Sequence, residues 1–475
     1  MDGLKENNSA VIEEREFGSK SISVLFWKYS MFALAGLSFT IVQTFLDGAF
    51  VGNGIGMEGF AVISVTSVLW QVAIALFGLF GIGGSTLAAI KLGSGDKDGA
   101  RAVYGNIMFF SFISTAIICF VIYLFLDQVM VFIGATPEIL ESTKTYSTVF
   151  LIGLPFCVAS TVVYYITRVD EKPLVACIAY AAPAIIAIVI EYYMIFKMDA
   201  GIGASAFAME VAMGMALFLV LYLQFGSSLF KLRLSDMKPD FKIILDTCKI
   251  GFAMFIIPFS TSAATIATNN MLIESGGNEM HLAAFGTISY MGYFFFILTN
   301  SFITGMQPIA SYNYGAKRFD RIRTLIRIGI VQSSAVVILL LGIAYFFKEP
   351  IILFLSGDPA LLDIAKPAVV IYMLLYAFGN VSQIVSGYYM SVERNAFAIL
   401  NGIARMTVFA VPLIFILPKF FGVDGVWMAQ PVADTLSCVL ALVCMTFEYK
   451  RLGVRQKEGE AISVAQLDTV SGGLD

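Results

Sequence analysis

The sequence predicts an all-α polytopic membrane protein, with twelve transmembrane helices in two pseudo-two-fold related six-helix bundles. Composition is the first reason: of the 475 residues, 58% are hydrophobic and 13% are charged, whereas a soluble domain carries about 25% charged residues. The second reason is that the apolar residues form long continuous runs, because a helix needs ~20 of them to cross the hydrocarbon core of a bilayer. These runs lack the alternation of a membrane β-barrel, so helices are expected rather than strands.

The first six helices are each expected from one apolar run and from the polar segments that bound it. The first run follows a charged segment without the apolar core or cleavage site of a signal peptide, and it ends at Asp47. The polar segments that separate the later runs are residues 91–101, 127–145, 168–173 and 197–201. The helices are therefore expected at residues 22–46, 60–90, 102–126, 146–167, 174–196 and 202–225.

The second six helices are expected from the same signals. The last two runs each contain a single charge, Arg405 in one and Asp434 in the other. Internal prolines such as Pro258 and Pro308 are compatible with these helices, because neighbouring groups in a membrane protein satisfy the freed carbonyls. The helices are expected at residues 247–273, 282–312, 324–347, 367–391, 396–417 and 423–447.

The distribution of positive charge predicts the domain boundaries and the orientation. Most of the 30 Lys and Arg residues fall in segments on the same side as the N-terminus, and the positive-inside rule assigns that side to the cytoplasm. Both termini are therefore expected to lie in the cytoplasm, and the protein is expected to reside in the cell membrane. The predicted domains are a tail at 1–21, lobes at 22–225 and 247–447, a basic linker at 226–246, and a polar, flexible tail at 448–475.

The two lobes are expected to be an internal repeat. The sequence can be aligned with itself so that Gly54 pairs with Gly276, and no gap is then needed for the other matches. These matches include Gly83 with Gly305, Pro137 with Pro359 and Glu171 with Glu393. Six helices is an even number, so both copies have the same orientation. Parallel repeats of this kind handle substrate between them in many transporters.

Three acidic residues are the main candidates for function. Asp47, Glu191 and Glu210 all fall in the outer half of the first lobe, at depths where its helices carry no Lys or Arg. Ionisable residues inside a membrane are costly and indicate function by default. Burial and mutual repulsion disfavour the charged form, so such acids are expected to hold a proton, a small cation or a cationic substrate, one at a time.

Structural roles are the alternatives for these residues. Asp47 could cap a helix end, Glu210 could face an aqueous vestibule without binding anything, and Glu191 could be purely structural. In the second lobe, Arg405 and Asp434 are expected to form a structural ion pair, because buried charges usually pair. The tyrosine pairs at 164–165, 192–193 and 388–389 could line a cavity or contact lipid.

Several motifs together resemble the multidrug and toxic compound extrusion (MATE) family. They are Asp47-Gly48-Ala49-Phe50-Val51-Gly52, Gly93-Ser94-Gly95-Asp96, Tyr314-Gly315-Ala316, and the stretch from Arg405 through Gly422-Val423-Asp424-Gly425 to Asp434. The resemblance covers nearly all twelve helices. It implies two six-helix bundles that export organic cations in exchange for H⁺ or Na⁺.

The resemblance also implies which residues take part in coupling. The family's acid on the first helix matches Asp47, and its Asn and Asp on the fifth helix fall on Ala187 and Glu191. The acids that some members carry in the seventh and tenth helices fall near Thr261 and on Asn380, so a sodium site of that kind is not expected in the second lobe. The first helix also lacks the proline that is thought to bend it in some members.

Other classes of function have weaker support. The formal net charge of −4 offers no basic excess for nucleic acid, and the six cysteines form no CxxC pair that would indicate a zinc site. The sequence Gly93-Ser94-Gly95-Asp96 matches the GxGD motif of intramembrane proteases, but Asp96 lies in a solvated loop and lacks the partner motif. A lipid-linked saccharide flippase would need several basic residues in its cavity for phosphate, and only Arg405 is present.

The sequence therefore predicts a secondary active antiporter and not an enzyme. It is expected to export amphipathic, cationic organic compounds in exchange for H⁺ or Na⁺ by alternating access. Asp47 and Glu191 are expected to bind the coupling ion, with Glu210 as a third cation or substrate residue. No cofactor or further metal is expected, and the partners are expected to be a small organic substrate and the lipid bilayer, with the protein as a monomer.

Overall fold

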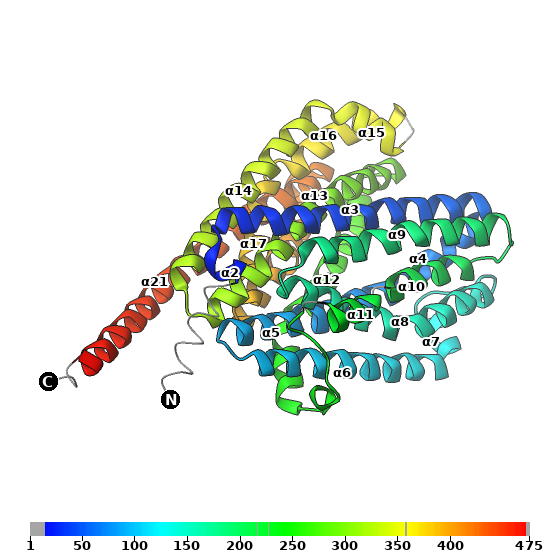
Figure 1. Ribbon diagram of the computed structural model, residues 1–475. Coiled ribbons are helices and arrows are strands. Elements are labelled where there is room, and N and C mark those ends of the chain that lie inside the picture. The colour runs from blue at the N-terminus through cyan, green and yellow to red at the C-terminus, as the bar shows by residue number, and fades with distance from the viewer. Residues whose placement is uncertain (1–14, 216, 227, 357–358, 472–475) are drawn as a thin grey trace. The chain divides into compact units, whose positions relative to one another are not determined.

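The computed structural model describes residues 15–471 apart from 216, 227 and 357–358. Every regular element in these residues is helical (Figure 1). The chain divides into two compact units. The N-terminal unit consists of Met31–Leu92 and Asp96–Pro258, and the C-terminal unit consists of Met1–Ser30, Gly93–Gly95 and Phe259–Asp475. The all-α membrane fold predicted from the sequence is confirmed.

The first half of the chain contains long helices joined by short turns. Their order is α2 (Glu16–Ser19), α3 (Ile22–Gly54), α4 (Met57–Leu76), the π-helix η1 (Phe77–Ile82), α5 (Gly83–Gly93), α6 (Lys97–Leu124), α7 (Leu126–Phe132), α8 (Leu140–Val169), α9 (Pro173–Phe196), α10 (Gly203–Met215), α11 (Phe218–Phe225) and the 3₁₀ helix η2 (Leu234–Met237). The division between the units runs through α3 and, later, through α12.

The second half follows a similar order. It contains α12 (Phe241–Glu274), α13 (Glu279–Gly315), α14 (Phe319–Phe346), α15 (Lys348–Ser356), η3 (Pro359–Leu361), α16 (Leu362–Met373), α17 (Tyr376–Ser391), α18 (Asn395–Ile403), the π-helix η4 (Ala404–Ala410), α19 (Val411–Ile416), α20 (Pro418–Phe421) and α21 (Val423–Ser471).

Ten helical segments in the described residues are long and apolar enough to span a membrane. An eleventh span results if α16 and α17, which meet at a bend of 46°, are taken together. The helix expected at 202–225 corresponds to α10 and α11, each shorter than a span, and residue 216 between them lies outside the described residues. The count of twelve is therefore not confirmed.

Two predicted helix ends were wrong. α3 continues past Asp47 to Gly54 because the intervening residues are small or apolar, and the backbone first turns at Gly56, whose φ is 87°. α21 continues past Glu448 to Ser471. The residues after Glu448 are polar, but many are good helix formers, so the expectation of a flexible tail fails as far as Ser471. Residues 472–475 lie outside the described part of the chain.

The internal repeat is confirmed by the element bounds. At the displacement that aligns Gly54 with Gly276, the segment from α4 to α5 coincides with α13, and α8 coincides with α16 and α17 together. Helices α6 and α14 coincide as well, each 28 residues long. The aligned residues Glu171 and Glu393 both have positive φ, at 65° and 58°. The two copies therefore share turns as well as helices.

The short helix α2 is docked within the C-terminal unit. Phe17 is fully buried, and its ring lies 5.2 Å from that of Tyr29 and 5.5 Å from that of Tyr312. Arg321 donates hydrogen bonds to the backbone carbonyl oxygens of Phe17 and Lys20. The N-terminal segment is thus fixed to α13 and α14.

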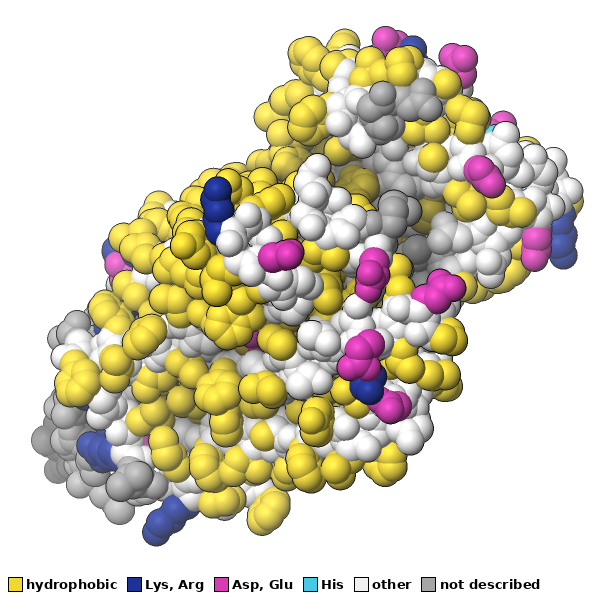
Figure 2. All heavy atoms as spheres, turned by 90° about the vertical axis from the view of Figure 1, so that its right-hand side faces the viewer, with side chains coloured by type: hydrophobic (Ala, Val, Ile, Leu, Met, Phe, Trp, Pro, Cys, Tyr) yellow, Lys and Arg dark blue, Asp and Glu magenta, His cyan; other side chains and the backbone are white. Residues whose placement is uncertain are grey.

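The surface is largely apolar. Figure 2 shows one face, on which hydrophobic side chains predominate and charged side chains are few. Large side chains are exposed on many helices, for example Phe120, Phe132, Phe225, Phe346 and Phe354. Large exposed apolar areas mark contact with a membrane or a partner, and two of these side chains, Phe120 and Phe346, lie on helices long enough to span a bilayer.

Candidate functional site

The site predicted from the sequence begins with two carboxyl groups in contact. α3 and α9 lie side by side (Figure 1), with Gly36 against Tyr180 and Gly54 against Ile195. This packing brings the carboxyl group of Asp47 on α3 to that of Glu191 on α9, and the two interact directly. A hydrogen bond between two carboxyl groups requires a proton on one of them.

The helix α10 supplies a third group to this pair. Ser205 is buried and donates a hydrogen bond of 2.5 Å to Oδ1 of Asp47. Glu191 is only 2% exposed, and its Oε1 has no hydrogen-bond partner. A buried polar atom without a partner is costly, so this oxygen is where a proton or a small cation would be stabilised.

Glu210 lies apart from the pair, deeper on α10. It is 6% exposed, and its Oε2 accepts a hydrogen bond of 2.7 Å from the Cys157 thiol on α8. Its Oε1 has no partner. Gly153 on α8 makes room for it, because a Cβ there would stand 2.3 Å from Glu210 Oε2. The structure thus separates Glu210 from the direct contact made by Asp47 and Glu191.

Tyr146 on α8 lies near all three acids. It is buried and lies close enough to Asp47, Glu191 and Glu210 to interact electrostatically with each of them. Its hydroxyl oxygen accepts a hydrogen bond of 3.1 Å from Nε1 of Trp70 on α4. The Trp70 ring also packs against Phe150 at 4.8 Å. Tyr146, Trp70 and Phe150 therefore form an aromatic cluster, of which Tyr146 lies near the acids.

Negative charge in this site is not neutralised by a basic side chain. None of the three acids forms an ion pair among the residues that the structure describes, where the ion pairs involve other acids. Within the same residues, no group of three His, Cys, Asp or Glu side chains is arranged to hold a metal ion. The arrangement can accept a proton, or one small or organic cation.

Sequence reasoning missed several members of the site. These members are Ser205, Cys157, Tyr146 and Trp70. They carry no charge, and their helices contain many other small, polar or aromatic residues, so no local sequence signal distinguished them. Their positions depend on how α8 and α10 are rotated about their axes. The suggestion that Asp47 caps a helix end was wrong, because α3 continues for two more turns.

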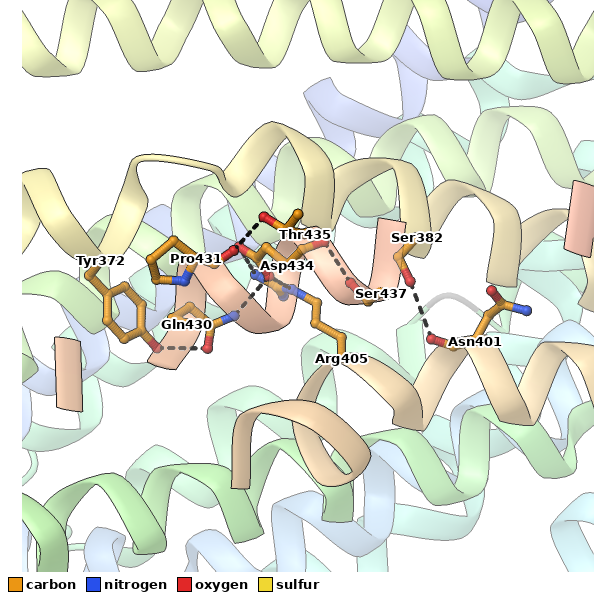
Figure 3. A network of polar contacts seen from close by, with 9 residues as sticks. All are labelled: Tyr372, Ser382, Asn401, Arg405, Gln430, Pro431, Asp434, Thr435 and Ser437. Carbon is orange, nitrogen blue, oxygen red and sulfur yellow. Dashed lines mark hydrogen bonds and ion pairs between the residues drawn. The ribbon is translucent and has the colours of Figure 1, made fainter. Parts of the chain in front are cut away.

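The predicted charge pair in the second lobe is present. Arg405 Nε donates to Asp434 Oδ1 at 2.5 Å, and Gln430 Nε2 donates to the same oxygen at 2.9 Å (Figure 3). Arg405 also stacks on Tyr376 at 5.0 Å. Asp434 is fully buried. Both charges are therefore satisfied inside the C-terminal unit, in contrast to the three acids of the N-terminal unit.

The side chain of Asn380 is also hydrogen-bonded. Some members of the family suggested by the sequence carry an acid at this position. Its Oδ1 accepts from Thr299, and its Nδ2 donates to Ser333 and Ser334. The side chain is fully buried. It is a neutral link between helices α13, α14 and α17.

Comparison with known proteins identifies the family. The family model MatE matches residues 25–193 and 250–416, which is most of the chain and both copies of the repeat. The chain is a MATE family transporter. The family is one of transporters, in agreement with the expectation that the chain is not an enzyme.

Relatives of this MATE transporter extend over nearly the whole chain. The multidrug export protein MepA of Staphylococcus saprophyticus is 21% identical over 431 residues, which cover 90% of this chain and 95% of that protein. A crystal structure of a MATE protein in complex with MaD3S has a TM-score of 0.85 at 20% identity, and the match covers 93% of this chain and 98% of that one.

A third match is a transporter for which a different function has been suggested. A MOP superfamily transporter from Pyrococcus furiosus, described as having a binding pocket of reverse polarity that suggests a different function, has a TM-score of 0.86 at 19% identity. The match covers 93% of this chain and 98% of that one. At this identity the likeness shows the fold alone, so the cargo must be argued from the side chains.

Proposed function

We propose that this MATE transporter is a secondary active antiporter that exports amphipathic, cationic organic compounds in exchange for H⁺ or Na⁺. The observation that carries the proposal is the contact between Asp47 and Glu191, two acids without an ion-pair partner in the described residues. Acids of this kind inside a membrane protein are costly and are retained for function. The relative named as a multidrug export protein supports the class of cargo.

The carboxyl pair gives the exchange its chemical basis. A coupling ion bound between Asp47 and Glu191 neutralises one of the two negative charges and occupies the space between them, so the pair attracts an organic cation less strongly. Once that ion leaves, the negative charge of the pair and the nearby ring of Tyr146 favour a cationic compound. The two guests exclude each other at the pair, which makes the transport an exchange. Each guest is proposed to bind the inward- and outward-open states with different affinity and so to shift the equilibrium between them. Glu210 would serve as a further cation or substrate residue.

The geometry favours H⁺ over Na⁺ as the coupling ion. In many transporters, carbonyl oxygens from unwound helix segments help to coordinate Na⁺. The helices α3, α9 and α10 are continuous at Asp47, Glu191 and Ser205, so their carbonyl oxygens are engaged in the helices. A proton needs only the two carboxyl groups that are already in contact.

The test is efflux of a cationic dye from proteoliposomes under an imposed gradient. Asp47→Asn and Glu191→Gln should each lower gradient-driven efflux at least about tenfold, equivalent to ~1.4 kcal/mol. Asp199→Asn is the matched control, since Asp199 is an exposed acid at φ 52°, a conformation that Asn also tolerates. Wild-type efflux in both site variants would overturn the proposal.

Separate gradients identify the coupling ion. A proton gradient alone should drive efflux, and a sodium gradient at equal pH on both sides should not. Efflux driven by sodium alone would leave the antiport proposal standing and replace the proton as the ion. The proposed setting is the cell membrane, with a monomer whose termini are cytoplasmic; protease protection in oriented vesicles tests that orientation.

The flippase alternative is not favoured by the site. A lipid-linked saccharide carries phosphate, which calls for several free basic groups. Arg405, the basic residue predicted within a membrane helix, is bound to Asp434 and stacked on Tyr376. The unpaired groups in the candidate site are acids, which would repel phosphate.

A further inference from the structure

Arg168, in the last turn of α8, is a buried cation that the transport site does not use. It is 2% exposed, and its terminal nitrogens Nη1 and Nη2 have no hydrogen-bond partner. Charged residues are almost never buried to this degree unless they are paired. The guanidinium group has five N–H donors in a planar fork. It interacts with the Tyr164 hydroxyl group, but neither terminal nitrogen has an acceptor in hydrogen-bonding geometry.

The surroundings of Arg168 are aromatic. The guanidinium carbon lies 5.7 Å from the ring centre of Tyr164 and 5.3 Å from that of Tyr165. The Tyr164 ring contacts that of Tyr180 on α9 at 4.3 Å. Stacking on these rings restrains the plane of the guanidinium group and offsets part of the free-energy cost of burying its charge.

The nearby acid does not neutralise Arg168. Asp170 is bound to Lys172, whose Nζ lies 3.0 Å from Asp170 Oδ2. The backbone N–H of Leu229 donates to its other oxygen at 3.2 Å. Arg168 itself forms no ion pair within the described residues. The helix dipole favours a cation at the end of a helix, but the contribution is smaller than the cost of burying an unpaired charge.

The second copy of the repeat shows that the fold does not require a cation at this position. Under the alignment of Gly54 with Gly276, Arg168 falls on Met390, which is 3% exposed. An apolar side chain thus fills the corresponding end of α17. A buried charge that does contact α17 in that copy, Glu448, is paired with Arg451 at 3.0 Å. The charge of Arg168 is therefore a property of the first copy alone.

We propose that Arg168 is the anchor of a phosphate-binding site at the end of α8. A phosphate group accepts two parallel N–H bonds from a guanidinium, which would satisfy both terminal nitrogens. The end of a spanning helix on the predicted cytoplasmic side is the level of lipid headgroups, and basic pockets between membrane helices at that level bind anionic headgroups. The phosphate comes from an anionic phospholipid or from free phosphate, and helix movements of the transporter would admit it.

The test measures binding without transport, so it is independent of the proposed antiport. The purified full-length protein in neutral detergent is heated with phosphatidylglycerol or with phosphatidylcholine in mixed micelles. A second series uses inorganic phosphate against chloride at equal ionic strength. A ligand that binds the folded state raises Tm. We expect phosphatidylglycerol or phosphate to raise Tm of the wild type, whereas phosphatidylcholine and chloride do not.

The variants separate the site from general charge effects. Arg168→Met copies the second repeat, so it should fold and lose the shift in Tm. Arg168→Lys keeps the charge without the planar fork and should retain part of the shift, which covers the case in which the Met variant is unstable. Lys242→Gln removes an exposed charge and should keep the whole shift.

Each outcome decides the question. A shift with phosphatidylglycerol alone assigns the site to a lipid, and a shift with inorganic phosphate assigns it to a free anion. A wild type that responds to neither overturns the proposal. A full shift that persists in Arg168→Met and in Arg168→Lys overturns it as well.

Discussion

At the scale of single residues, the N-terminal unit differs from the C-terminal unit in how it treats charge. Glu191 and Glu210 each keep one carboxyl oxygen without a partner, although both side chains are buried. Asp434 is as deeply buried, but it receives hydrogen bonds from Arg405 and Gln430. Glu191 and Glu210 therefore differ from Asp434, which is paired with a basic side chain.

Gly153 is a residue where a single methyl group should matter. Replacing it with Ala places Cβ against the Glu210 carboxyl group, so Glu210 must move or the helices must separate. Overpacking of this kind costs ~1–3 kcal/mol. Gly153→Ala should therefore lower Tm and weaken efflux of those substrates that need Glu210.

Gly214→Ala on α10 is the matched control for that experiment. Its Cβ would meet only Phe156, at an ordinary 3.8 Å, and Ala is favoured over Gly in a helix by up to ~1 kcal/mol. It should keep or raise Tm. If both variants had the same Tm and the same efflux, Gly153 would not be shaping the position of Glu210.

At the scale of elements, the π-helix η4 carries Arg405 into the buried network of Figure 3. Arg405→Met leaves Asp434 as an unpaired buried charge, which costs ~3–5 kcal/mol. The variant should be much less stable in thermal unfolding than the wild type. Adding Asp434→Leu should recover most of the loss, because a buried pair can be replaced by apolar side chains at little cost.

The double variant also tests whether this pair is structural. If the pair only supports the C-terminal unit, the double variant should retain gradient-driven efflux close to that of the wild type. Loss of efflux at normal stability would instead give Arg405 and Asp434 a part in transport.

The docking of α2 should depend on pH. Burial raises the pKa of Glu16, but hydrogen bonds and charge from Lys20 and Lys28 outweigh burial and hold the pKa below its usual value. A lowered pKa gives stability that is present above the unfolded pKa of ~4.3 and is lost as pH falls through the folded value. α2 should therefore loosen below about pH 4.

A spin label at the exposed Ser19 can measure this change. Its mobility should rise as pH falls through that range in the wild type. In Glu16→Gln the label should be more mobile at neutral pH and should show no such transition. A label equally immobile at all pH values would mean that the apolar contacts of Phe17 alone hold the segment.

At the scale of the whole molecule, α21 is far longer than a bilayer requires. Its 49 residues extend ~73 Å at about 1.5 Å per residue, against ~30 Å of hydrocarbon. The part just beyond the predicted membrane span makes specific contacts. Glu448 accepts a hydrogen bond of 3.2 Å from Tyr388, and Arg455 donates one of 3.1 Å to Tyr314. This segment joins α21 to α17 and α13.

Truncation should separate the two parts of α21. A chain that ends after Lys457 keeps these contacts and should match the full-length Tm. A chain that ends after Phe447 loses both Glu448 and Arg451 and leaves Arg394 without its acid, so its Tm should fall. Equal Tm values for both truncations would show that the contacts contribute nothing to stability.

Much of the fold could be predicted because membrane spans are long and apolar. The helix expected at 174–196 is α9 at Pro173–Phe196, and the repeat was visible because its turns keep their glycines and charges. Helix ends were harder, since Asp47 looked like an end although the helical backbone continues past it. The contacts of Tyr146 and Ser205 could not be predicted, because they depend on the rotation of helices that present similar residues on several faces.

The thiol of Cys157 gives the candidate site a reporter of its own. Its S–H bond points at Glu210, and the S–H stretching vibration absorbs in a region of the infrared spectrum where other protein groups do not. The band should move to lower frequency when Glu210 carries its full negative charge. Replacing the five other cysteines would leave a single band, so the charge of one carboxyl group could be followed optically while the transporter turns over, without attaching a dye.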